Sequence, residues 1–148
     1  KMTLTQATEM TRQQVLTLMA CMLSTAHVDG VSPQELALMK SFYEQSGHTD
    51  LPPFADNEGA YGDPMAMAAQ CASDSGFAEQ LVLMSFMTAY ADGHLTDAER
   101  AHVLLIAARA GLAEARTQRL LQQVKDMLIG AIAMIPDTES VASIAKGL

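Results

Sequence analysis

An internal repeat is the feature of this sequence that most limits its fold. Residues 18–30, LMACMLSTAHVDG, align with residues 81–93, LVLMSFMTAYADG, and both segments end in the dipeptide Asp-Gly. With one inserted residue at His94, the alignment continues until Gly47 pairs with Gly111. A repeat of this kind indicates that one supersecondary unit is used twice. The sequence therefore predicts a duplicated chain.

Each repeat predicts a helix, a tight turn and a second helix. The first helices, at about residues 11–27 and 76–90, are apolar on nearly every face, which is typical of helices at the centre of a bundle. Gly30 and Gly93 stand where a residue in the left-handed conformation would end these helices. The two repeats are thus expected to share one helix–turn–helix geometry.

The second helices are marked by their first residues. The segment SPQE at 32–35 combines an N-cap hydroxyl, a proline at the first helical position and a glutamate that can complete a capping box. The segment TDAE at 96–99 repeats this pattern with an acidic first turn. Both helices then run to a glycine, Gly47 or Gly111. We therefore expect second helices of similar length in both repeats.

The remaining segments predict further helices and one long loop. Residues 48–63 are rich in proline and glycine and are expected to form a loop, followed by a short helix at about 64–73. After Gly111, an apolar stripe at helical spacing runs to Ile135 and stops at Pro136-Asp137. A last helix is expected at about 140–146, which gives about seven in all.

Composition supports a single all-α domain. The 148 residues are enough for one domain with its own core, and the apolar set is dominated by Ala, Leu and Met, which are strong helix formers. The expected organisation is one domain over 1–148, with repeat one at about 11–47, a loop and short helix at 48–75, repeat two at about 76–111 and C-terminal helices at 112–148.

Charge and hydropathy narrow the range of partners. The formal net charge of −8 argues against nucleic acid and anionic membrane surfaces, because binding to both depends on clustered Lys and Arg. Cations or a protein partner fit this charge better. The apolar runs are shorter than the roughly 20 residues of a membrane span. We therefore expect no direct membrane insertion and a cytoplasmic location.

The candidate functional residues are acidic and lie at the two turns. Asp29 and Asp92 follow the C-terminal ends of helices, where the helix dipole disfavours a carboxylate by ~0.3–1 kcal/mol. One explanation is structural: each carboxylate accepts hydrogen bonds from the free amides of the following helix. Glu35 and Glu99 likewise have a structural explanation as capping-box residues. These interpretations predict turns that are satisfied internally.

The second explanation is a cation site. If the two repeats pack about a pseudo-two-fold axis, four carboxylates converge: Asp29, Glu35, Asp92 and Glu99. Such a cluster repels itself unless it is protonated or holds a cation, and oxygen ligands suit Ca²⁺, Mg²⁺ or Mn²⁺. A capping glutamate uses one oxygen and leaves the other free, so the two explanations are compatible.

These motifs carry a family resemblance. DGVSPQE at 29–35 and ADGHLTDAE at 91–99, each after an apolar helix, resemble the paired acidic turns of the TerB-like tellurite-resistance family. The similarity covers about residues 15–47 and 78–112. It implies an all-α fold with internal pseudo-symmetry that is related to the N-terminal domain of DjlA-type, DnaJ-like co-chaperones. It also implies a bacterial stress-response setting, no established catalytic activity and a divalent-metal site at the four acidic positions named above.

Three functions follow as hypotheses. The first is a metal-responsive sensor or scaffold, and the second is a structural protein-interaction module with self-capped acidic turns. The third is a metal-dependent hydrolase, which is disfavoured because the sequence lacks a nucleophile elbow, a phosphate-binding loop and an HExxH motif. A di-iron site using Glu99 and His102 is also disfavoured, because the matching position in the first repeat is Leu38. The sequence thus predicts a non-enzymatic protein.

Overall fold

The computed structural model describes residues 10–132, with side chains described to residue 130. Within that range the chain is all-helical and has no strand. Its six helices are α1 (Arg12–Ala26), α2 (Pro33–Glu44), α3 (Pro64–Ala69), α4 (Ser75–Ala89), α5 (Asp97–Arg109) and α6 (Glu114–Ile132).

Capping chemistry sets where the principal helices begin. Complete capping boxes start α1, α2 and α5 at Thr11, Ser32 and Thr96, so the two boxes predicted from sequence are confirmed. Gly30 and Gly93 adopt φ angles of 90° and 101°, which lie in the left-handed region that residues with a Cβ avoid. The turns between α1 and α2 and between α4 and α5 are therefore tight.

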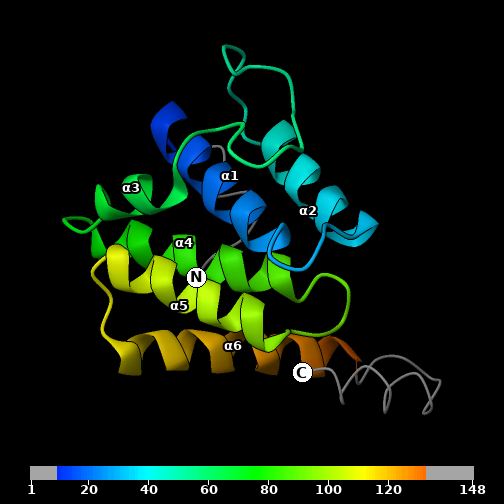
Figure 1. The fold of residues 1–148 in the computed structure, drawn as a ribbon, viewed down its shortest axis with the longest axis vertical. Helices are drawn as coiled ribbons and strands as arrows, with labels where there is room; N and C mark the ends of the chain where they lie inside the picture. The colour runs from blue at the N-terminus through cyan, green and yellow to red at the C-terminus, as the bar shows by residue number, and fades with distance from the viewer. Residues whose placement is uncertain (1–9, 133–148) are drawn as a thin grey trace.

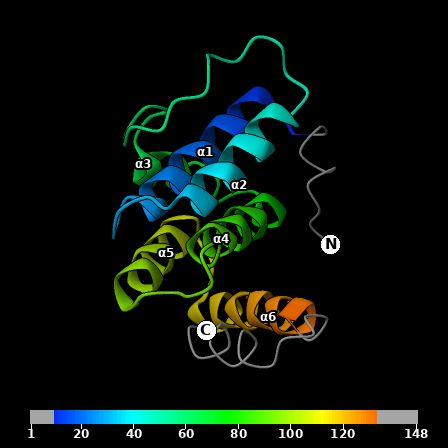
Figure 2. The ribbon, with the colours of Figure 1, turned by 90° about the vertical axis from the view of Figure 1, so that its right-hand side faces the viewer.

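Helix α4 lies at the centre of the molecule. It packs against α1, α2, α5 and α6, while α3 packs against α1 and α5 (Figure 1). Figure 2 shows α6 running below α4, on the side away from α1 and α2. This central position explains why α4 is apolar around most of its circumference.

Two hydrophobic clusters form the core. The larger cluster joins α1 to α2, α3, one face of α4 and Ile106 of α5. The other joins a second face of α4, with Val82 and Phe86, to α5 and α6. Three methionines of the apolar first helices, Met19, Met22 and Met84, pack in the core and are 2% exposed or less. Met87 is only partly buried, since it faces a surface groove described below.

The long loop at residues 48–63 contains no helix, as expected. It is tied to the helices by side chains. The Tyr43 hydroxyl donates to the Pro52 carbonyl, and the rings of Tyr43 and Tyr61 meet edge-on with centroids 5.4 Å apart. The imidazole Nε2 of His27 lies 2.7 Å from the Asp56 carbonyl oxygen. The loop is therefore attached at several points to α1 and α2.

One predicted helix boundary differs from the structure, and one predicted helix lies outside the described residues. The short helix was expected to reach residue 73 but ends at Ala69, because Asp74 caps the next helix by accepting from the Phe77 amide and the chain must first leave the helical path. The described residues contain six helices, whereas about seven were predicted; the seventh, at 140–146, lies outside the described range. No described helix is both long enough and apolar enough to span a membrane.

Candidate functional site

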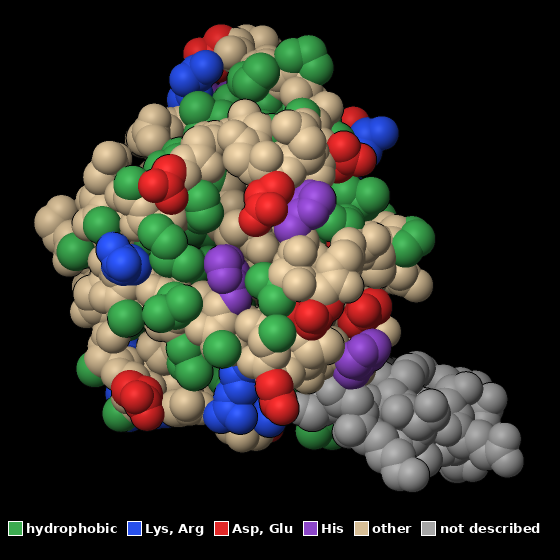
Figure 3. Space-filling view, in the orientation of Figure 1, with side chains coloured by type: hydrophobic (Ala, Val, Ile, Leu, Met, Phe, Trp, Pro, Cys, Tyr) green, Lys and Arg blue, Asp and Glu red, His purple; other side chains and the backbone are tan. Residues whose placement is uncertain are grey.

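The two acidic turns meet at Thr96. We define the first acidic turn as residues 27–32 and the second as residues 90–96. The Thr96 hydroxyl caps α5 by accepting from the Glu99 amide at 3.1 Å, and it donates its own proton to the Asp29 carboxylate. Asp29 of the first acidic turn thus binds the residue that caps α5, the helix after the second acidic turn. Figure 3 shows acidic side chains next to one another over this region.

Glu35 is the most deeply buried of the four candidate carboxylates. Its side chain is 1% exposed although it belongs to the first turn of α2. Its Oε1 accepts from the Ser32 amide at 2.8 Å, and its own amide donates to the Ser32 hydroxyl at 3.1 Å. Its Oε2 has no hydrogen-bond partner. Among the buried side-chain oxygen and nitrogen atoms of the described residues, only Ser46 Oγ shares this property. One carboxylate oxygen therefore caps a helix while the other is buried without a partner.

The charges of two other candidate carboxylates act on the pKa of Glu35. Burial raises the pKa of the Glu35 carboxyl from its ordinary 4.5 to about 7, although the hydrogen bonds from Ser32 lower the pKa. The negative charges of Glu99 and Asp92 add to the rise. Since both belong to the second unit (α4 and α5), the structure places acidic groups of both units near one another.

Glu99 repeats the capping geometry of Glu35. Its Oε1 accepts from the Thr96 amide at 3.0 Å, and its side chain is 4% exposed. Both glutamates are therefore buried with one oxygen on a helix cap, so the structural interpretation of their first oxygen is confirmed. The capping box does not account for the second oxygen of either residue.

The aspartates differ in their partners. Asp29 bonds across to Thr96, whereas Asp92 stays within its own turn. The Asp92 Oδ1 accepts from the His94 amide at 3.4 Å and lies 3.8 Å from the His94 ring nitrogen Nδ1. We expected each aspartate to accept hydrogen bonds from free amides at the start of the next helix. Neither does: Asp29 accepts from the Thr96 hydroxyl, and Asp92 accepts from an amide within its own turn.

The four carboxylates share a neighbourhood without forming a finished metal site. Within residues 10–132, no three side chains of Asp, Glu, His or Cys are gathered closely enough to hold a metal ion as they stand. Asp29 and Asp92 occupy exposed turn positions, while Glu35 and Glu99 are buried in the first turns of α2 and α5. The arrangement offers a buried oxygen without a hydrogen-bond partner, on a carboxyl group that the charges of Glu99 and Asp92 reach.

Sequence reasoning missed the second role of Thr96. The hydroxyl was assigned as a cap, and nothing in the local motif indicates that it also donates to a residue 67 positions earlier. Two other histidines have partners outside the acidic turns: His102 Nε2 is 2.9 Å from the Ser24 hydroxyl, and His27 holds the long loop. Burial lowers the pKa of His102, which favours its neutral form. His102 is thus a link between α5 and α1.

Comparisons with known proteins give no independent assignment. The chain matches no family model, no curated protein and no solved structure.

Proposed function

We propose that this chain is a non-enzymatic, divalent-cation-binding helical domain, a sensor or scaffold of the TerB-like, bacterial stress-response type. The proposed ligands are the carboxylates of Asp29, Glu35, Asp92 and Glu99. The observation that carries the proposal is the Oε2 atom of Glu35, which is buried and lacks a hydrogen-bond partner.

The chemistry of this position favours a cation. A buried carboxylate without a partner is costly unless it is protonated or bound to positive charge. Burial, together with the charges of Glu99 and Asp92, raises the pKa of Glu35 to about 7 and so disfavours its charged form. A divalent ion would remove that cost, and hard ions such as Ca²⁺, Mg²⁺ and Mn²⁺ prefer oxygen ligands. Binding would release the Glu35 proton, so affinity should rise with pH.

The exposed aspartates would complete the ligand set. Asp29 and Asp92 sit on turns that the tight glycine conformations of Gly30 and Gly93 place at the molecular surface. Rotation of their side chains toward Glu35 would gather the ligands from both units. In this proposal the two units are a duplicated pair related by a pseudo-two-fold axis, so that one cation contacts both.

A cation held this way would act on the angle between the units. Its ligands come from the α1–α2 turn and the α4–α5 turn, so occupancy would fix one turn relative to the other. The surface that includes both units would then differ between the metal-free and metal-bound forms. That difference is what a sensor or scaffold presents to a protein partner.

Thermal unfolding with defined free metal tests the proposal. The melting temperature of the EDTA-treated protein should rise with Ca²⁺, Mg²⁺ or Mn²⁺, because a ligand at 100 times its Kd stabilises by about 2.7 kcal/mol. Asp29→Asn with Asp92→Asn should abolish the rise, and so should Glu35→Gln. The matched control is Glu44→Gln, an exposed carboxylate in the last turn of the same helix as Glu35.

A second candidate function is favoured by the completed caps. Both glutamates close capping boxes, and Asp29 bonds to Thr96, which is what a structural interaction module with self-satisfied turns requires. That module would show no metal-dependent stabilisation in the wild-type protein, and the double aspartate variant would behave like the Glu44 control. This result would overturn the cation proposal in favour of the module.

A further inference from the structure

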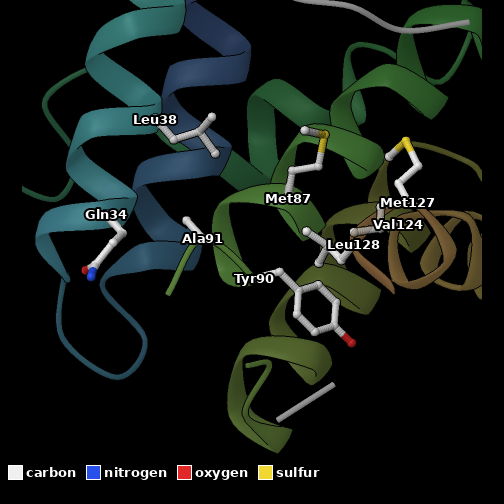
Figure 4. Close-up of a pocket in the computed structure, with 8 residues that line it drawn as sticks. All are labelled: Gln34, Leu38, Met87, Tyr90, Ala91, Val124, Met127 and Leu128. Atoms are coloured by element: carbon white, nitrogen blue, oxygen red, sulfur yellow. The ribbon is translucent and has the colours of Figure 1, made fainter. Parts of the chain in front are cut away.

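An apolar groove lies on the side of the molecule between α2, α4 and α6. Its volume is about 410 Å³, and its principal walls are Leu38 of α2, Met87 of α4, Tyr90 just after α4, and Val124, Met127 and Leu128 of α6. In Figure 4 Leu38 lies on one side of the groove, and Met87, Met127 and Leu128 lie on the other. Apart from Tyr90 and Ala91, at the start of the second acidic turn, its lining residues lie outside both acidic turns.

The burial of α6 decreases where it reaches this groove. Leu120, Leu121 and Val124 are at most 3% exposed, but Met127, one turn further on, is 45% exposed. Large apolar side chains are normally covered when they border a concave apolar surface. The groove therefore lacks a cover among the described residues at the end where α6 approaches its last residue.

The chain itself continues from this end. Residues 133–148, outside the described range, follow directly after α6, and Leu128 lies only four residues before its end. Within this segment Val141, Ile144, Ala145 and Leu148 have the i, i+3, i+4, i+7 spacing of one helical face. On such a helix Ser143 would lie on the opposite face.

We infer that residues 140–148 form an amphipathic helix that folds back and docks its apolar face in this groove. The chain between Ile132 and Val141 can span up to roughly 30 Å when extended, which is ample for a return to Leu128. Pro136 interrupts the helical path and permits the reversal. Because the segment is tethered to a wall of the groove, its effective concentration there is in the millimolar range.

This docking is independent of cation binding, and the full-length chain can report on it through its methionines. With ¹³C-labelled methionine methyl groups, Val141→Asp with Ile144→Asp should shift the resonances of Met87 and Met127. The methyl of Met19, which is fully buried in the other core cluster, should stay in place and so report an intact fold. Ser143→Asp is the matched control on the opposite face and should leave all three unchanged.

A second measurement needs no variant. In the wild-type protein, the Met127 methyl should give nuclear Overhauser contacts to the Ile144 side chain, and amides of 141–148 should exchange about tenfold more slowly than in the double variant. Absence of both effects would overturn the inference. Resonances of Met87 and Met127 that move with protein concentration would assign the groove to a second copy, and a released small molecule found by mass spectrometry would assign it to a ligand; either result would also overturn it.

Discussion

The two acidic turns use the same residues but hold them differently. In both, an Asp-Gly pair follows an apolar helix and a hydroxyl–glutamate capping box begins the next. Yet Asp29 of the first turn reaches across to Thr96, whereas Asp92 of the second stays with His94. A repeated motif thus fixes the local caps and leaves the contacts between turns unequal.

The glutamates show the same inequality. Both cap their helices through Oε1, but Glu35 has a buried second oxygen without a partner and faces the charges of Glu99 and Asp92. The first unit therefore contributes the group whose charge the site tolerates least. The motif thus supplies the four carboxylates, while packing decides which of them is buried and has a raised pKa.

The largest expected effect comes from Glu35. In metal-free protein its pKa is raised from 4.5 to about 7, so between these values the folded state keeps a proton that the unfolded chain has lost. The contribution of Glu35 to stability should therefore be complete below pH 4.5, fall by up to about 1.4 kcal/mol per pH unit in this window, and be lost above 7. Glu35→Gln should flatten that slope, as measured by urea unfolding at a series of pH values.

Glu99→Gln is the matched comparison. It should reduce the slope only in part, because burial, the largest cause of the shift, remains at Glu35. Glu79, whose pKa is lowered chiefly by its hydrogen bonds with Arg116, changes stability only below its ordinary pKa and so outside this window. A slope in Glu35→Gln as steep as in the wild type would show that Glu35 is not the group responsible.

Much of the local structure could be predicted from the sequence, since it depends on contacts three or four residues apart. The hydroxyl and glutamate of each capping box, and the glycines at 30 and 93, are sufficient to mark the turns and the helices after them. The candidate carboxylates were found for the same reason. The long loop was also evident from its prolines and glycines.

What could not be predicted depends on packing between distant segments. The bond from Thr96 to Asp29 joins residues 67 apart, and Glu35 is 1% exposed although it lies in the first turn of α2. A capping glutamate is ordinarily exposed at a helix start, so its motif gives no sign of a partnerless oxygen. The groove between α2, α4 and α6 likewise exists only once three separated helices have packed.

Substitution of Thr96 should have the second-largest effect on the free energy of unfolding. Ser32→Ala and Thr96→Ala each remove an N-cap, which costs about 1 kcal/mol. Thr96→Ala also removes the bond to Asp29, so its total cost should be about 2 kcal/mol. Chemical denaturation at pH 7 should show the larger loss for Thr96→Ala, while Thr96→Ser, which keeps the hydroxyl, should stay near the wild type.

A double-mutant cycle isolates the contact between the turns. Asp29→Asn and Thr96→Ala, made singly and together, should give a coupling energy of about 0.5–1 kcal/mol. Asp29→Asn combined with Ser32→Ala should be additive, because no contact joins Asp29 to Ser32 among the described hydrogen bonds. Equal costs for the two cap variants, with no coupling, would mean that the turns are held together by helix packing alone.

The smallest expected effect concerns His94, the residue inserted in the second turn. Its ring is 54% exposed and its Nδ1 lies 3.8 Å from Asp92, so any ion pair is a surface one and His94→Ala should change the free energy of unfolding by less than about 0.5 kcal/mol. The closer contact to Asp92 is the backbone amide, which the substitution retains. Unfolding in low and high salt at pH 5.5 measures this directly, since screening removes a surface pair. A salt-dependent loss above about 1 kcal/mol would instead show that the inserted ring, and not the backbone, makes the second turn differ from the first.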